Sequence, residues 1–203
     1  MDIFLVALLS YLSGSIPFGL VLVKIFSKAD IRKIGSGNIG ATNVLRTGNK
    51  YLALITLLLD ILKGYIPAII TSQHYPELIQ LSCLLTFLGH LFPIWIKFKG
   101  GKGVATYLGI LFALSLHLSL LFIFTWLVVF LIFKYSSLSS MFASLTIFVV
   151  TVIKDTVLKS INTNINFDED IKLILFIFFI LIIFTHRKNI SSLKNGTEQK
   201  IKI

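Results

Sequence analysis

Charged residues are scarce in this sequence. Asp, Glu, Lys and Arg together make up 14% of its 203 residues, and hydrophobic residues make up 56%. An ordinary soluble domain carries about 25% charged residues. The composition therefore excludes a soluble domain of ordinary make-up, and we interpret the chain as an integral membrane protein.

Cysteine is almost absent as well. The single Cys83 lies within an apolar run, which excludes a disulfide framework and a thiol metal cluster. We expect its side chain to face lipid or to pack in the core. Acidic residues number only 9, and the motifs contain no carboxylate cluster that suggests a metal. We therefore predict that the protein uses no metal and no cofactor.

The N-terminus lacks the features of a signal peptide. It opens with Asp2 and is apolar to about Phe26, without a positive n-region or a small-residue cleavage site. We expect this segment to be retained as the first span. No internal repeat and no Pro/Ser linker divides the chain, so residues 1–203 are interpreted as a single membrane domain.

The sequence contains several long apolar runs. A helix that crosses a hydrocarbon core needs roughly 20 apolar residues. Val104–Phe133 has no charged residue and is too long for one upright helix, so we expect it to turn within Leu114–Ser119. We predict an all-α integral membrane protein with seven transmembrane helices, some of them short or broken, or six if this run does not turn. The other predicted spans are Ile3–Phe26, Tyr51–Thr71, Leu78–Phe98, Ser139–Leu158 and Ile171–Thr185.

The distribution of Lys and Arg favours seven spans and sets the orientation. Loops rich in these residues stay cytoplasmic, and an external N-terminus with a cytoplasmic C-terminus places fifteen of them inside and three outside. The inside set is Lys24, Lys28, Arg32, Lys33, Arg46, Lys50, Lys97, Lys99, Lys102, Lys134, Arg187, Lys188, Lys194, Lys200 and Lys202. The outside set is Lys154, Lys159 and Lys172, in a segment that also carries Asp155, Asp168, Glu169 and Asp170.

The net charge of +10 might suggest a nucleic-acid partner. The basic residues, however, lie at the ends of apolar runs, where they suit anionic lipid headgroups and phosphorylated substrates. We predict membrane lipid as a partner and no nucleic acid, and we expect the chain to act as a monomer.

A glycine-rich loop between Lys33 and Arg46 is the first candidate site. Glycine lets the backbone approach a phosphate closely, and Arg46 can grip phosphate oxygens bidentately. The spacing formally matches a dinucleotide fingerprint, but a membrane span precedes it, and the Lys of a Walker A loop is missing. We predict an anion-binding nest, the alternative being a flexible turn. The predicted phosphate-binding residues are Gly35, Ser36, Gly37, Asn38, Gly40, Ala41 and Thr42.

A second basic loop runs from Gly89 to Gly103. Pro93 should break the helix, and Lys102 stands between glycines as a phosphate ligand. We interpret Lys97 and Lys99 as membrane-interface anchors. His90 lies alone in an apolar helix, where a hydrogen-bonded structural role is commoner than a catalytic one.

The third candidate segment follows the last span. On a continuing helix, His186 and Asn189 share a face and can address one ligand. A polar hinge at Tyr135–Ser140 can supply a hydroxyl or merely turn the chain. Asp60 and Lys63, three residues apart in the second span, are interpreted as a neutralising pair.

Several of these motifs together resemble one known family. They are Ser13-Gly-Ser-Ile-Pro-Phe-Gly19, the Gly-Ser-Gly-Asn-Ile-Gly-Ala-Thr-Asn loop, Gly-His-Leu-Phe-Pro with Phe-Lys-Gly-Gly-Lys-Gly-Val-Ala-Thr106, and His-Arg-Lys-Asn-Ile. Their order and spacing resemble those of the PlsY-type acyl-phosphate:glycerol-3-phosphate acyltransferases of bacteria, over the whole chain.

The resemblance implies a reaction and a location. Acyl phosphate and sn-glycerol 3-phosphate give 1-acyl-glycerol 3-phosphate and phosphate, the first acylation step of phospholipid synthesis, at the cytoplasmic face of the bacterial cell membrane. It implies that the loop from Gly35 to Thr42 receives the acyl-phosphate headgroup. The glycerol-phosphate site is implied to contain Arg46, Lys102, one hinge serine, for which we choose Ser137, His186 and Asn189.

Two positions depart from the family's pattern. Ser192 stands where a basic residue is expected, and Lys134 where an Arg is usual. The motifs contain no Ser-His-Asp set, so we expect direct transfer without an acyl-enzyme, with His186 or a substrate phosphate oxygen taking the hydroxyl proton. A rival interpretation is a small transporter of a phosphorylated or anionic solute, since basic loops and broken helices also suit that role.

Overall fold

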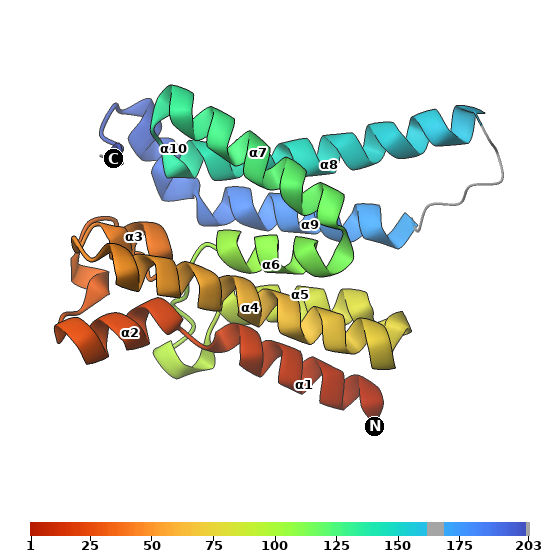
Figure 1. Ribbon diagram of the computed structural model, residues 1–203, viewed down its shortest axis with the longest axis horizontal. Helices are drawn as coiled ribbons and strands as arrows, with labels where there is room; N and C mark the ends of the chain where they lie inside the picture. The colour runs from red at the N-terminus through yellow and green to blue at the C-terminus, as the bar shows by residue number, and fades with distance from the viewer. Residues whose placement is uncertain (162–168, 202–203) are drawn as a thin grey trace. The chain divides into compact units, whose positions relative to one another are not determined.

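The structure is a computed structural model that describes the backbone of residues 1–161 and 169–201 and the side chains of residues 1–154 and 171–201. Every regular element in these ranges is a helix (Figure 1), which confirms the all-α prediction. The chain divides into two compact units, Met1–Leu116 and His117–Ile203. Each unit is described by itself.

The first unit contains helices α1 to α6. Pro17 follows a break at Ile16 that separates the first two helices, and Pro93 follows the end of the fifth helix, as predicted. The helices are α1 (Asp2–Ser15), α2 (Phe18–Ser27), α3 (Ala41–Leu45), α4 (Lys50–His74), α5 (Ile79–Leu91) and α6 (Val104–Leu114), with 3-10 turns η1 (Ile31–Lys33), η2 (Pro76–Leu78) and η3 (Ile94–Ile96).

Glycines bring pairs of these helices into close contact. A Cβ at Gly14 of α1 would overlap the carbonyl of Thr86 in α5, and a Cβ at Gly89 of α5 would overlap the carbonyl of Tyr11. In the same way, Gly64 of α4 lies against the Thr106 carbonyl of α6. Such small residues let helix backbones approach in a membrane, where dispersion and hydrogen bonds replace the hydrophobic effect as the driving force.

The second unit contains α7 (Leu116–Phe133), whose first residue closes the first unit, followed by α8 (Ser136–Ile161), α9 (Glu169–Thr185) and α10 (Arg187–Lys194). The long apolar run is interrupted where expected, because α6 ends at Leu114, Ser115 is extended, and α7 begins at Leu116. The last pair of helices differs from the prediction of a continuing helix, since α9 and α10 meet at 55°.

Five helical segments of the described chain are long and apolar enough to cross a membrane. They are Asp2–Ser27, Lys50–His74, Pro76–Ile96, Leu116–Phe133 and Ser136–Lys154, and the bent pair Ile171–Thr185 with Arg187–Lys194 makes a sixth if it is one span. The apolar helix Val104–Leu114 is shorter. The count of seven and the orientation remain predictions, and the predicted external segment from Asp155 to Asp170 lies outside the residues whose side chains are described.

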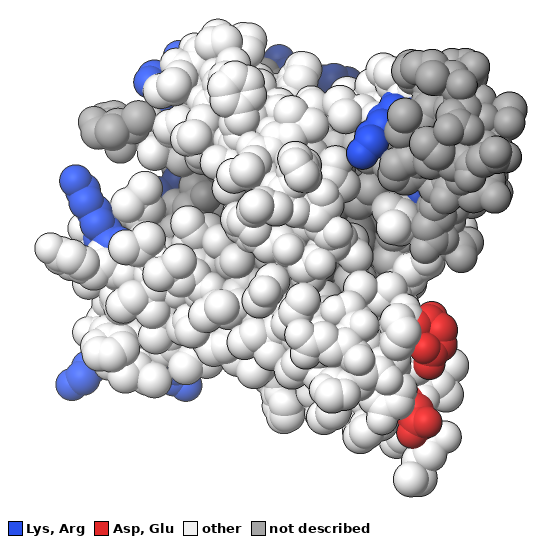
Figure 2. All heavy atoms as spheres, turned by 45° about the vertical axis from the view of Figure 1, so that its right-hand side comes forward, with Lys and Arg blue, Asp and Glu red and all other residues white. Residues whose placement is uncertain are grey.

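Charge is distributed unevenly along the first unit. On the face drawn in Figure 2, its basic side chains lie at one end and its acidic side chains at the other. The positions of these charged residues in the sequence explain this distribution. The loop that joins α2 to α4 carries Lys28, Lys33 and Arg46, whereas Asp2 begins α1 and Glu77 lies in the turn between α4 and α5.

Candidate active site

The first glycine-rich loop is held by one amide, that of Asn43. This buried side chain donates from Nδ2 to the carbonyls of Ile34 at 2.9 Å, Asn38 at 2.7 Å and Ile31 at 3.1 Å. Its Oδ1 accepts the backbone N–H of Ser36 at 2.9 Å. A hydrophobic cluster beneath the loop, which includes Val23, Ile31, Ile39, Val44 and Leu52, anchors it to α2 and α4. The loop is therefore a defined structure and not a flexible turn.

Arg46 lies across this loop at its glycine. A Cβ at Gly35 would lie 2.5 Å from Asn43 Oδ1 and 2.7 Å from Arg46 Cδ, and the φ of Gly35 is +53°. Only glycine accepts both the left-handed backbone and this crowding. The stem of Arg46 thus packs against Gly35, next to the exposed Ser36.

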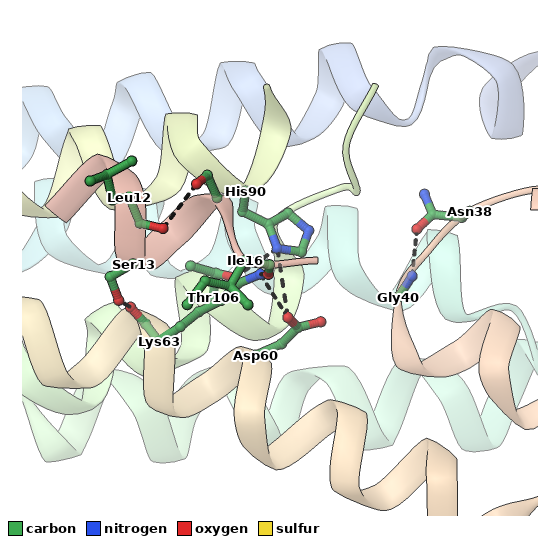
Figure 3. A network of polar contacts seen from close by, with 10 residues as sticks. Leu12, Ser13, Ile16, Asn38, Gly40, Asp60, Lys63, His90 and Thr106 are labelled. Carbon is green, nitrogen blue, oxygen red and sulfur yellow. Dashed lines mark hydrogen bonds and ion pairs between the residues drawn. The ribbon is translucent and has the colours of Figure 1, made fainter. Parts of the chain in front are cut away.

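The predicted nest of backbone N–H groups needs a correction at three positions. The N–H of Ser36 donates to Asn43, that of Gly37 to the Ile34 carbonyl at 2.9 Å, and that of Gly40 to Asn38 Oδ1 at 2.9 Å. These donors are used inside the loop because they build its turns. The Asn38 amide nitrogen points away from Gly40 (Figure 3). Ala41 and Thr42 begin α3, beside these groups.

Arg32 of the same loop is already paired. It donates from Nε and Nη2 to the two carboxylate oxygens of Asp30, each at 2.9 Å. The guanidinium and the Arg32 N–H hold the pKa of Asp30 at about 2, below its ordinary value of 3.8. Arg32 and Asp30 therefore form an exposed bidentate ion pair within the loop.

The second basic loop folds back on the end of α5. The N–H groups of Gly100 and Gly101 donate to the carbonyls of Leu91 and His90, each at 3.1 Å. Lys97 and Lys99 are exposed, whereas Lys102 is half-buried between two buried glycines. The three lysines thus differ in exposure, and their assignment as phosphate ligand and interface anchors stays a prediction.

Below this loop lies a buried polar cluster (Figure 3). Lys63 Nζ is 2.8 Å from Asp60 Oδ1 and donates to the Ile16 carbonyl at 2.7 Å. The predicted neutralising pair is confirmed. His90 Nδ1 shares a hydrogen bond of 3.1 Å with the Thr106 hydroxyl, which confirms its interpretation as a hydrogen-bonded group. Cys83 packs in the core and does not face lipid.

In the second unit, His186 occupies the bend between α9 and α10. Its side chain is 1% exposed, and Nδ1 lies 2.8 Å from the Ile182 carbonyl. A carbonyl oxygen only accepts, so Nδ1 of a neutral ring carries the proton and Nε2 carries the lone pair. His186 and Asn189 thus belong to a bent segment and not to one face of a straight helix.

Ser137 and Asn189 meet through a residue to which the sequence assigned no role. One oxygen of Glu198, Oε1, accepts the Ser137 hydroxyl at 2.8 Å and the Asn189 amide at 2.7 Å. The hydroxyls of Ser139 and Ser140 instead donate to the carbonyls four residues before them, each at 2.8 Å. Ser140 also accepts the Trp126 Nε1–H of α7 at 3.1 Å, so among these three serines Ser137 is the one whose hydroxyl donates to a carboxylate.

The turn after α10 brings Glu198 to this position. Gly196 has a φ of +69°, and the Ser192 carbonyl accepts the N–H groups of Thr197 at 2.8 Å and Glu198 at 3.2 Å. Further on, the N–H of Ile201 donates to the Lys134 carbonyl at 3.1 Å. A glycine after the last helix was the available signal, because it favours a chain reversal.

The predicted site residues therefore form two groups. The first unit holds the loop from Gly35 to Thr42, Arg46 and Lys102, and the second unit holds Ser137, His186 and Asn189. Within the described ranges, no three His, Cys, Asp or Glu side chains gather in a way that could hold a metal ion.

Known proteins are similar to this chain over nearly its whole length. The family model described as glycerol-3-phosphate acyltransferase matches residues 4–196. The chain is 53% identical over 203 residues to a glycerol-3-phosphate acyltransferase of Pelagibacter ubique (strain HTCC1062), with all of both chains covered. It is 49% identical over 191 residues to one of Mesorhizobium japonicum, covering 94% of this chain and 92% of the relative.

Two solved structures are also similar. Both are crystal structures of PlsY (YgiH), an integral membrane glycerol 3-phosphate acyltransferase. Its glycerol 3-phosphate form has 35% identity and a TM-score of 0.90, and its lysophosphatidic acid form 34% and 0.87. Each comparison covers 100% of this chain and 96% of the other. The chain therefore belongs to the glycerol-3-phosphate acyltransferase family.

Proposed function

We propose that this chain transfers a fatty acyl group from acyl phosphate to sn-glycerol 3-phosphate, giving 1-acyl-glycerol 3-phosphate and inorganic phosphate. The observation that carries the proposal is its family membership, together with solved relatives in a glycerol 3-phosphate form and a lysophosphatidic acid form. Two loops with cationic side chains beside glycines, at Arg46 and Lys102, suit a reaction in which both substrates carry phosphate.

The loop from Gly35 to Thr42 receives the acyl-phosphate headgroup in this proposal. The residues proposed for the glycerol-phosphate site are Arg46, Lys102, Ser137, His186 and Asn189. Arg46 offers a planar fork that matches phosphate oxygens, and Lys102 offers a compact charge. The Ser137 hydroxyl and the Asn189 amide are donors that here meet the carboxylate oxygen of Glu198, so they can equally meet an oxygen of a substrate.

The reaction needs no covalent enzyme intermediate, because acyl phosphate is already activated. A glycerol hydroxyl oxygen attacks the acyl carbonyl carbon, the bond from that carbon to the phosphate oxygen breaks, and the hydroxyl proton goes to an acceptor. Catalysis then rests on positioning and on stabilising the charge of the tetrahedral intermediate and the departing phosphate. Neutral His186 has its lone pair on Nε2 and is one acceptor; a substrate phosphate oxygen is the other.

Replacing His186 by Ala separates these two acceptors. If Nε2 takes the proton, kcat should fall by roughly 10²–10⁴-fold, the usual contribution of a general base. If kcat stays near its original value and only the KM for glycerol 3-phosphate rises, His186 is a binding residue and the substrate phosphate takes the proton. The exposed His74 provides the control, since His74→Ala should alter neither constant.

The orientation is part of the proposal, with the active site at the cytoplasmic face of the bacterial inner membrane. In a Cys83→Ser background, an impermeant thiol reagent should label Tyr75→Cys from outside the cell. It should not reach Ser36→Cys or Asn195→Cys. Labelling of Asn195→Cys from outside would overturn the proposed orientation.

One assay tests the activity and its donor. Purified protein in detergent should make lysophosphatidate from glycerol 3-phosphate with acyl phosphate as donor, in preference to acyl-CoA or acyl carrier protein. A transporter would instead move solute in proteoliposomes and make no lysophosphatidate. If product forms only from acyl-CoA, the protein is still an acyltransferase, but acyl phosphate is not its donor.

A further inference from the structure

A buried polar cluster in the first unit contains side chains that the proposed reaction does not use. Asp60, Lys63, His90 and Thr106 are each at most 4% exposed. Polar groups are costly inside a membrane protein unless they are paired or functional. Asp60 and Lys63 neutralise each other at 2.8 Å, so charge balance accounts for these two residues but not for His90 and Thr106.

The imidazole of His90 contacts the chain on both sides of Lys102. Before Lys102, a Cβ at Gly101 would overlap His90 Nε2, so the α-carbon of this glycine lies against the ring. After Lys102, the Thr106 hydroxyl, in the first turn of α6, lies 3.1 Å from His90 Nδ1 (Figure 3). Lys102 stands between these two contact points in the chain.

Both contact points are themselves held in place. The Gly101 N–H donates to the His90 carbonyl at 3.1 Å, which ties the loop to the last turn of α5. The Thr106 carbonyl lies against Gly64 of α4. Asp60 Oδ1 lies 4.0 Å from His90 Nδ1, and its partner Lys63 donates to the Ile16 carbonyl at the break between α1 and α2. The ring therefore lies between Gly101 and Thr106, whose backbones pack against the end of α5 and against α4.

We propose that Thr106 and His90, supported by Asp60, form a positioning cluster. This cluster holds the loop around Lys102 in the conformation in which the lysine binds the phosphate of glycerol 3-phosphate. The inference rests on the proposed function of Lys102. A short loop with several glycines has many conformations, and a cation reaches a phosphate in few of them. The buried His90 ring contacts the chain at Gly101 and at Thr106. These two contacts restrict the conformations of the loop before the substrate binds.

Two substitutions at Thr106 test this role. Thr106→Val keeps the branched shape and removes the hydroxyl, so the His90 ring loses its hydrogen bond. We expect the KM for glycerol 3-phosphate to rise on the order of 10-fold, as for loss of one buried hydrogen bond. The KM for acyl phosphate should stay unchanged, because that headgroup belongs to the loop from Gly35 to Thr42. Thr106→Ser keeps the hydroxyl and should restore the original KM.

Ser82 provides a matched control. Its hydroxyl shares a buried hydrogen bond of 2.8 Å with Ser10, between α1 and α5 of the same unit. Ser82→Ala should lower the unfolding temperature without changing either KM. If Ser82→Ala and Thr106→Val raise the KM equally, the effect is general loosening, and the proposal fails.

A double-mutant cycle asks whether Thr106 acts through Lys102. Lys102→Ala should raise the KM for glycerol 3-phosphate, and adding Thr106→Val should then raise it by less than 2-fold more, as for coupled residues. Additive effects would overturn the proposal. Should Thr106→Val not fold, His90→Gln replaces it in the cycle, since its amide reaches towards Thr106 but lacks the ring against Gly101.

A binding measurement separates this inference from the proposed function. Glycerol 3-phosphate should raise the unfolding temperature of the original protein in detergent. Thr106→Val should need about 10-fold more ligand for the same shift. If the original protein shows neither this shift nor activity, the proposed function fails. If it shows both, and Thr106→Val matches it in KM and in shift, the positioning inference alone fails.

Discussion

The two glycine-rich loops of the first unit reach defined shapes by opposite means. The loop from Gly35 to Thr42 is organised by an amide from its own segment, Asn43, which makes four hydrogen bonds to residues 31–38. The loop from Gly100 to Gly103 has three glycines, which lie against His90, Leu91 and Phe87 of α5. The first shape is local, and the second depends on how the helices pack.

We expect the largest effect from substitution of Asn43, the side chain that organises the first loop. Asn43→Ala removes an amide with two N–H donors, which are shared among three carbonyls, and one accepting oxygen. At about 1 kcal/mol for each of these three groups, the free energy of unfolding should fall by about 3 kcal/mol. The kcat/KM for acyl phosphate should fall on the order of 100-fold or more. Both can be measured in detergent, by chemical unfolding and by steady-state kinetics.

Asn49 gives the control for this change. It caps α4 by accepting the Leu52 N–H at 3.0 Å. Asn49→Ala should therefore lower the free energy of unfolding by about 1 kcal/mol and leave the acyl-phosphate KM unchanged. Asn43→Ala protein that folds and keeps its KM would show that the loop's shape does not matter for binding.

A pair of glycines tests the dependence of the second loop on helix packing. Gly103 and Gly48 have similar left-handed backbones, with φ of +82° and +86°. A Cβ at Gly103 would overlap the Phe87 ring, whereas nothing lies within 4 Å of one at Gly48. Gly48→Ala should destabilise by about 1–2 kcal/mol, from the backbone alone. Gly103→Ala should cost about 3 kcal/mol, because overpacking adds to the strain.

Measuring the loss of unfolding free energy in each variant tests whether the shape of the second loop depends on packing against α5. Equal losses for Gly103→Ala and Gly48→Ala would mean that Phe87 moves aside without cost. The second loop would then resemble the first, with a shape that does not depend on α5.

Substitutions at Arg46 and Arg32 compare the proposed substrate contact of Arg46 with the surface ion pair of Arg32, both in the first loop. Arg46→Lys keeps the charge but loses the planar fork, so kcat/KM should fall by an amount equal to about 1.5–3 kcal/mol. Arg32→Lys disturbs the exposed pair with Asp30 and should change kcat/KM by less than about 0.5 kcal/mol. A near-normal kcat/KM in Arg46→Lys would show that charge alone suffices.

The smallest effect belongs to Asp30 and depends on pH. Its pKa is held at about 2, below its ordinary value of 3.8, chiefly by the Arg32 guanidinium. A depressed pKa stabilises the folded state above the unfolded pKa, and this contribution is lost as the pH falls towards the folded value. The small difference in unfolding temperature between the original protein and Asp30→Asn should be constant above about pH 4 and shrink towards about pH 2. A difference that does not change with pH would mean that the pair contributes nothing through its charge.

Some features were predictable because they depend on neighbours in the chain. Apolar runs of helical length predicted the helices, Pro93 the end of α5, and the polar residues near Ser115 the break between α6 and α7. Asp60 and Lys63 are three apart on one helix, so their ion pair followed from helical geometry. The bend at His186 was missed, because no proline or glycine marks it.

Composition and local spacing were enough to establish that this is a helical membrane protein and to point to its two basic, glycine-rich loops. These properties follow from transfer of side chains into lipid and from the period of a helix, which act over a few residues. Only the tertiary structure decided that Asn43 uses the Ser36 N–H, that His90 lies against Gly101, and that Glu198 joins Ser137 to Asn189. Those contacts depend on how the backbone turns and packs in three dimensions, and spacing along the chain does not encode that.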